Sequence, residues 1–120
     1  MIGDTITVSY NAGNVVLTKI NQDNYGAEYL YKDATLEYRM KVRHSSSVRS
    51  GTTYDRHNIE LTRTVYGVAP APNVTQKAYL VVETPATSDP TDAFRTTQCL
   101  VDELDETSGA LITKLIGWES

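Results

Sequence analysis

Apolar and polar residues alternate along most of the first 84 positions, with the period of two that is typical of strands with one buried face. The clearest stretch covers residues 35–44. Its apolar positions are Leu36, Tyr38, Met40 and Val42, and its charged positions are Glu37, Arg39, Lys41 and Arg43. One face of this strand is therefore predicted to pack in a core and the other to carry charge. Six strands are predicted in total, over residues 5–10, 14–20, 27–32, 35–44, 54–66 and 74–84.

Turn-forming residues separate these strands. Residues 11–14 are rich in Asn and Gly, which tolerate the positive φ angles of tight turns, so the first two strands are predicted to form a β-hairpin. Residues 21–26 form a polar loop, and the Ser- and Gly-rich residues 45–53 are expected to turn the chain. Residues 67–73 contain two prolines, which cannot donate to a strand ladder, and are predicted to protrude as a loop.

The last quarter of the chain has the pattern of two helices. Asp89 is a good N-cap, Pro90 suits the first helical position, and Asp92 lies near the positive end of the helix dipole. The apolar or small residues that follow at helical spacing are Phe94, Thr97, Val101 and Leu104. Thr107 or Ser108 is predicted to cap a second helix that carries Leu111, Ile112, Leu115 and Ile116 and ends at Gly117.

The predicted fold class is therefore α+β, with one domain over residues 1–120. Residues 1–85 supply the hairpin and sheet, and residues 89–117 supply two helices. Two short helices are too few to cover a sheet of five or six strands, so a single chain would expose apolar surface. We therefore expect an obligate two-fold homodimer in which strands pair or abut across the axis.

Charge is distributed unevenly along the chain, although its formal net charge is −4. Residues 31–65 hold seven basic and four acidic side chains, whereas residues 83–120 hold two basic and eight acidic ones. Such asymmetry is compatible with a surface that faces a polyanion. No apolar run approaches the length of a membrane helix, and no signal peptide pattern is visible, so a cytoplasmic protein is expected.

The residues needed for catalysis are sparse. No nucleophile elbow, phosphate loop or metal-ligand pair is present, so we expect no enzyme activity, metal or cofactor. By strand parity His44 and His57 fall on the apolar side, where a core or interface role is favoured over a catalytic one. The single cysteine, Cys99, excludes an intrachain disulfide and is expected to be a buried helix residue.

The charged face of the sheet offers chemistry for nucleic acid. Residues at every second position of a strand project from one side at intervals of roughly 7 Å, close to the spacing of phosphates. Cations there attract a polyanion, an amide reaches a base edge, and an aromatic ring stacks on an unpaired base. The candidate RNA-binding residues are Arg39, Lys41, Arg43, Arg56, Asn58, Lys77 and Tyr79. The alternative is an ordinary solvated face with cross-strand ion pairs, such as Glu37 or Glu60 with Arg56.

Three segments together resemble the coat proteins of levivirus-like, single-stranded RNA bacteriophages. They read YRMKVRHS at residues 38–45, DRHNIELTRTV at 55–65 and AYLVVETP at 78–85, and the acidic helical tail follows them. The resemblance implies an N-terminal hairpin, a five-stranded antiparallel sheet and two C-terminal helices that hold the partner subunit. It further implies dimers that build an icosahedral shell, package genomic RNA and bind an RNA stem-loop that represses replicase translation.

The resemblance also assigns roles to positions of this chain. The basic sheet face is expected to line the shell interior, with Glu60 and Val81 as departures from the family's polar surface. Contacts between dimers are expected from Gly67, Val68, Ala69, Pro70, Ala71, Pro72 and Asn73, and contacts between the helices of a dimer from Phe94, Val101, Leu104, Leu111 and Leu115. The protein is then expected in the virion, after assembly in the bacterial cytoplasm. The rival hypotheses are an RNA-binding regulator that does not assemble and a small β-rich enzyme.

Overall fold

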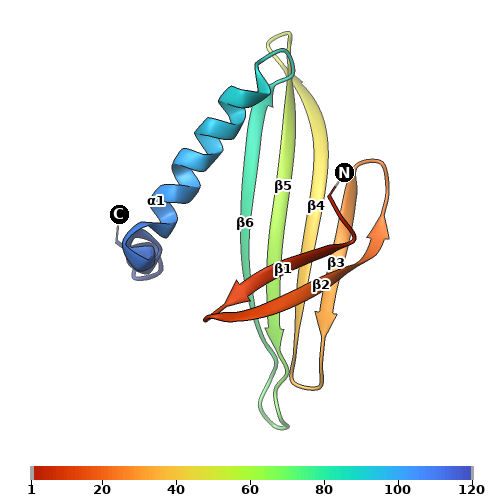
Figure 1. Cartoon of the computed structure of the whole chain (residues 1–120), viewed down its shortest axis with the longest axis vertical. Coiled ribbons are helices and arrows are strands. Elements are labelled where there is room, and N and C mark those ends of the chain that lie inside the picture. The colour runs from red at the N-terminus through yellow and green to blue at the C-terminus, as the bar shows by residue number, and fades with distance from the viewer. Residues whose placement is uncertain (1, 120) are drawn as a thin grey trace.

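The structure is a computed structural model that describes residues 2–119. Six strands form one antiparallel sheet in which each strand pairs with the next in sequence (Figure 1). The strands are β1 (Thr5–Tyr10), β2 (Gly13–Gln22), β3 (Gly26–Lys32), β4 (Leu36–Arg49), β5 (Thr52–Val65) and β6 (Val74–Pro85). The α+β class and all six strands of the alternating pattern are therefore confirmed.

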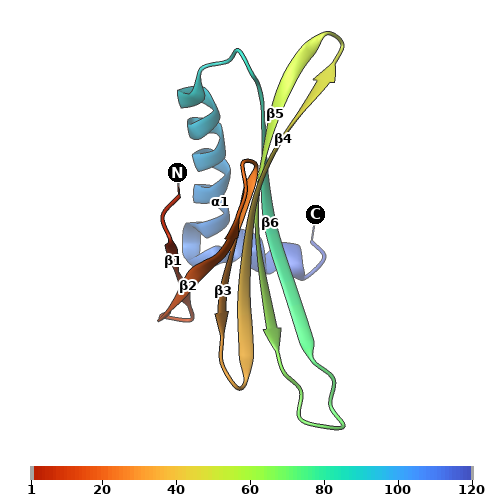
Figure 2. The same ribbon diagram turned by 90° about the vertical axis from the view of Figure 1, so that its right-hand side faces the viewer.

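The first hairpin folds back over one face of the sheet. β2 pairs with β3, but its register shifts between Lys19 and Asn21, and the hairpin swings across β4 and β5 (Figures 1 and 2). In this position Leu17 of β2 packs against the sheet, and its side chain is 0% exposed. The buried core consists of Leu17, Tyr29, Tyr38, Met40 and Val42.

Polar groups of aromatic and basic side chains hold the hairpin in place. The hydroxyl of Tyr29 donates a hydrogen bond to the carbonyl oxygen of Gly3 at 2.8 Å. The guanidinium of Arg63 lies 4.3 Å from the ring centroid of Tyr10 and donates to the hydroxyl of Tyr38 at 3.2 Å. The core therefore lies between the hairpin, β3 and β4. The burial of Tyr38, Met40 and Val42 confirms the prediction that the even-numbered side of β4 faces inward.

The sheet differs from the expected hairpin plus five strands. Because β2 pairs with both β1 and β3, the hairpin is part of the sheet, and only four strands follow it. Residues 45–53 are also not a long turn, as their composition suggested. Ser50 and Gly51 alone make the turn, with φ angles of 49° and 79°, and pairing continues out to Arg49 and Thr52. Two central residues with positive φ match the twist of a tight hairpin, and the ladder then outweighs the weak strand propensity of serine.

The C-terminal region is helical, as predicted, and is assigned as one element, α1 (Pro90–Ile116). Asp89 caps it by accepting a hydrogen bond from the amide of Thr91 at 2.9 Å. The backbone from Glu106 to Gly109 is not helical, and α1 turns sharply there (Figure 2). The interruption includes the predicted second cap at Thr107 and Ser108. No helix in residues 2–119 has the length and apolar character needed to cross a membrane.

Substitution of Leu17 tests how much of the stability depends on the hairpin core. We expect Leu17→Ala to lower the free energy of unfolding by about 2–5 kcal/mol, because the side chain is buried and leaves a cavity. Val16→Ala is the matched control, because the side chain of Val16 points outward. This substitution should lower the free energy of unfolding by less than about 1 kcal/mol. Urea unfolding at one fixed protein concentration measures both values, and equal losses would contradict this assignment of the core.

The turn between β3 and β4 makes a contribution to folding stability that depends on pH. One carboxylate oxygen of Asp33 accepts hydrogen bonds from the amides of Thr35 and Leu36 at 2.7 and 3.0 Å. These bonds stabilise the charged form and lower the pKa of Asp33 to about 2. Because the folded pKa lies below the unfolded value of about 3.9, this contribution is present above pH 4 and is lost as the pH falls towards 2.

We therefore expect Asp33→Asn to reduce the loss of stability between pH 5 and pH 2. The measurement is the urea midpoint of the original protein and of the variant across this range. The two midpoints should differ at pH 5 and converge at pH 2. Parallel curves would show that the turn contributes nothing through its charge.

Candidate nucleic-acid interface and assembly surfaces

The strand register places all seven candidate RNA-binding residues on one face of the sheet. Residues that are direct partners across strands point to the same side. Three rows cross the sheet in this way: Arg39–Thr62–Lys77, Lys41–Glu60–Tyr79 and Arg43–Asn58–Val81. Arg56 continues the face as the partner of Ser45. We call the surface formed by Arg39, Lys41, Arg43, Arg56, Asn58, Lys77 and Tyr79 the basic face.

The basic face lies opposite the core. Tyr38, Met40 and Val42 alternate with the basic residues of β4 and are buried under the hairpin. The hairpin and the first part of α1 both lie on the core side, and the last part of α1 runs past the edge of β6 towards the other side (Figure 2). The fold therefore keeps its own packing on one side and presents the cations on the other.

Two cations of the basic face are held by carboxylates. Arg39 forms a hydrogen-bonded ion pair with Glu28 of β3, which raises the pKa of the guanidinium above its ordinary value. Lys77 lies 3.6 Å from Glu60, as nitrogen to oxygen. Cross-strand ion pairs are therefore present, but not those expected, since Glu37 instead accepts a hydrogen bond from the hydroxyl of Tyr66 at 3.2 Å.

The other three cations have no such partner. Within residues 2–119, the side chains of Lys41, Arg43 and Arg56 make no hydrogen bond or ion pair. Arg43 and Arg56 are exposed, and Lys41 is half-buried between its strand partners Glu28 and Glu60. The positive charge that is free to meet an anion is concentrated on β4 and β5.

An amide and an aromatic ring add chemistry beyond charge. Asn58 is half-buried beside Arg43, and its Oδ1 atom is buried without a hydrogen-bond partner. A buried acceptor without a partner costs about 1–3 kcal/mol, and the rest of this half-buried amide borders the basic face. The ring of Tyr79 is 67% exposed and therefore free to stack. Phosphate binding, base-edge recognition and stacking are thus available on one surface.

One basic and one aromatic residue of this face were not predicted from the sequence. Arg49 and Tyr54 lie at the same parity as the basic face; Arg49 lies beyond the predicted end of its strand, and Tyr54 is the first residue of the predicted strand 54–66. The guanidinium of Arg49 lies 4.9 Å from the ring centroid of Tyr54 and donates to Glu83 at 2.6 Å. The alternating spacing from Arg43 to Arg49 was a signal for this extension, but the serines between them obscured it.

The residues expected at the dimer interface form an uncovered apolar surface in the single chain. Phe94 and Leu115 of α1 are 62% and 66% exposed, Val101 and Leu111 are also exposed, and Leu104 is half-buried. No residue of α1 is fully buried, and the helix contacts the sheet chiefly along β6. Cys99, expected to be buried, is exposed on this helix because α1 has no second layer over it.

The loop of residues 67–73 has a defined shape although it is exposed. The amide of Gly67 donates to Oδ1 of Asn73 at 2.9 Å, and the amide of Ala71 donates to the carbonyl oxygen of Val68 at 2.8 Å. A Cβ atom at Gly67 would overlap the carbonyl oxygens of Ala71 and Pro72. Val68 of this loop is 84% exposed, so the loop presents an apolar side chain on a fixed backbone.

Comparison with known proteins identifies relatives of this chain. The family model described as phage phiCb5, coat protein, matches residues 3–85, which include the hairpin and the whole sheet. No curated protein sequence matches significantly. Among solved structures, the bacteriophage EMS014 coat protein is similar at 18% identity and a TM-score of 0.71, over 92% of this chain and 80% of that one.

Two further structures have the same fold. A virus-like particle of bacteriophage AVE019 is similar at 10% identity and a TM-score of 0.73, over 100% of this chain and 97% of that one. An unassembled virus coat protein dimer, also described as a bacteriophage RNA-binding dimer, is similar at 17% identity and a TM-score of 0.58, over 97% and 94% of the chains. The family match over more than half of the sequence, together with this shared fold, shows that the chain belongs to the phage phiCb5 coat protein family, within the RNA bacteriophage coat proteins.

Proposed function

We propose that this coat protein forms a two-fold dimer, assembles into a closed icosahedral shell and holds single-stranded RNA on its basic face. The observation that carries the proposal is the separation of the two sides of the sheet. Lys41, Arg43 and Arg56 are available on one side, and the core, the hairpin and the first part of α1 lie on the other. A shell subunit needs this division, because one surface must meet RNA while another meets protein.

The dimer is supported by two uncovered surfaces. The outer edge of β6 is a strand of 12 residues with no further strand beside it within the described chain. An exposed edge of this length is a template for pairing, and two copies can join their β6 edges to make one continuous sheet. The apolar residues of α1, including Leu111 and Leu115, would then cover the partner's sheet. Two chains thereby bury what one chain leaves exposed.

The RNA role is supported by complementary chemistry on the basic face. Free cations supply affinity that depends on salt, and the half-buried amide of Asn58 can reach a base edge. The exposed ring of Tyr79 can stack on an unpaired base. We infer that this surface lines the shell, packages genomic RNA and binds a stem-loop as a repressor of replicase translation.

The contacts between dimers that close the shell are then made by the loop of residues 67–73. Its internal hydrogen bonds keep Val68 outward, in a position to meet neighbouring dimers around the symmetry axes. The loop contains no cysteine, so these contacts are expected to be non-covalent. The assembled protein belongs in the virion, after formation in the bacterial cytoplasm. A regulator that binds RNA without assembling is the alternative.

Assembly is tested by size-exclusion chromatography and electron microscopy of the purified protein. We expect uniform closed particles that dissociate to dimers. Leu115→Asp should abolish both the particles and the dimers, because it places a charge in the apolar surface of α1. The single chain should not be disturbed, since the side chain of Leu115 is 66% exposed there. Gln98→Asp, an exposed polar position on the same helix, is the matched control and should still assemble. A protein that stays dimeric under every RNA and salt condition would favour the regulator.

Binding to RNA is tested by filter binding of dimers at several salt concentrations. Lys41→Ala and Arg43→Ala should each weaken binding and reduce the slope of log K against log salt by about one phosphate contact. Tyr79→Ala should cost about 1–3 kcal/mol if the ring stacks on a base. Glu60→Gln should tighten binding, because it removes a negative charge beside Lys41 and Lys77.

The control for charge is Arg95→Ala on α1, which removes one positive charge away from the basic face. Its effect on RNA affinity should be small at physiological salt, because screening limits distant charges. If Arg95→Ala and Arg43→Ala weaken binding equally, the interaction depends on net charge alone. That result would place the RNA elsewhere on the molecule.

A further inference from the structure

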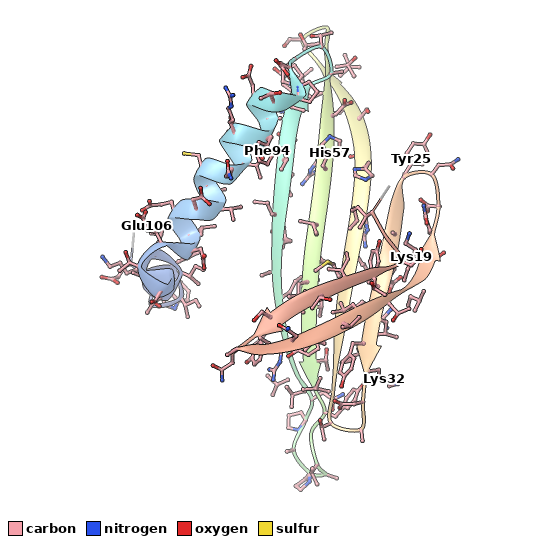
Figure 3. All side chains as sticks on the ribbon, viewed as in Figure 1. Lys19, Tyr25, Lys32, His57, Phe94 and Glu106 are labelled. Atoms are coloured by element: carbon pink, nitrogen blue, oxygen red, sulfur yellow. The ribbon has the colours of Figure 1, made fainter. Side chains whose placement is uncertain are left out.

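Both histidines of the chain lie side by side on the core side of the sheet, opposite the basic face. His44 of β4 and His57 of β5 are direct antiparallel partners, and their Nδ1 atoms are 2.8 Å apart. The ring centroids are 5.0 Å apart and the ring planes are inclined by 69°. Both side chains are exposed, and Figure 3 shows His57 projecting from β5 beyond the span of the hairpin. Solvent therefore reaches a point where two imidazole nitrogens meet.

This arrangement has the chemistry of a pair of metal ligands. In the neutral pair, one Nδ1 donates its hydrogen to the other, so only one proton separates the two nitrogens. That proton can move through solvent to Nε2 of the same ring, and rotation of the two exposed rings then directs both Nδ1 lone pairs at one ion. Neutral imidazole is the commonest side-chain ligand of divalent transition metals.

We propose that His44 and His57 together bind a divalent transition-metal ion through their Nδ1 atoms. At metal–nitrogen distances of about 2.0–2.1 Å, nitrogens 2.8 Å apart subtend about 85–90° at the ion. This angle suits adjacent positions of a square-planar or octahedral shell, the geometries of Cu²⁺ and Ni²⁺. A tetrahedral Zn²⁺ would require the nitrogens about 3.3 Å apart, so the site favours Cu²⁺ or Ni²⁺.

Water completes the ligand shell. Residues 2–119 contain no cluster of three or more His, Cys, Asp or Glu side chains that could hold a metal. Both imidazoles are exposed, so solvent water has access to the remaining positions of the ligand shell.

A nearby carboxylate adds favourable charge. Asp55 precedes His57 by two residues on the same face of β5, and Oγ of Ser46 donates to its Oδ1 at 3.0 Å. At this spacing Asp55 can accept a hydrogen bond from a metal-bound water, the usual role of a carboxylate outside the ligand shell. The site is independent of the proposed RNA surface, because the sheet separates them.

Copper binding to the assembled dimer tests the proposal. The protein should be untagged and carry Cys99→Ser, so that the exposed thiol does not compete. Titration with Cu²⁺ should saturate at one ion per chain, and the electron paramagnetic resonance spectrum should show coupling to two nitrogens. His44→Asn and His57→Asn should each weaken binding by about tenfold or more, since even outer ligand partners contribute 10- to 100-fold.

Two controls keep the result decisive. Gln98→Asp on α1 retains both histidines and should bind copper as the parent does. If a histidine variant fails to fold, selective broadening of both histidine ring signals by Cu²⁺ in the parent's NMR spectrum replaces it. Unchanged affinity in the His44→Asn/His57→Asn double variant would overturn the proposal. Absence of nitrogen coupling, or of binding to the dimer because the partner closes the site, would do so as well.

Discussion

The antiparallel pairing of β4 with β5 and of β5 with β6 is the constraint on which the rest of the structure depends. Its register runs without a break from Leu36 opposite Val65 to Arg49 opposite Thr52, and from Tyr54 opposite Pro85 to Val65 opposite Val74. A slip of one residue would turn every side chain of a strand to the other face. The same ladder therefore keeps the apolar residues inward, the cations outward and the two histidines together.

The core shows why this protein is suited to assembly. Its five buried residues come from β2, β3 and β4, where the hairpin packs on the sheet, whereas β5, β6 and α1 contribute none. Ile59 remains exposed on the sheet, and several apolar side chains remain exposed on α1. The single chain thus completes one half of a core and leaves the other half for a second layer. A partner subunit, as in the proposed dimer, would supply that layer and so couple folding to assembly.

The fold of this chain is shared by proteins with little sequence identity to it. Solved phage coat structures share the fold at 10–18% identity. Many apolar side chains fill a pleated surface equally well, so a sheet of this kind tolerates wide substitution. The family model covers the sheet and stops at residue 85, before the helix begins.

The sequence by itself determined the six strands, the inward side of β4, the loop at residues 67–73 and the helix start at Asp89, because each depends on local spacing and backbone chemistry. It also grouped the basic residues, since strand parity is a local property. Tertiary structure alone decided the length of the β4–β5 ladder, the pairing of Glu28 with Arg39 and of Glu60 with Lys77, and the contact between His44 and His57. These features depend on which residues face one another across strands. Register is set by the summed pairing of whole strands and by the φ angles of two turn residues, which no single segment encodes.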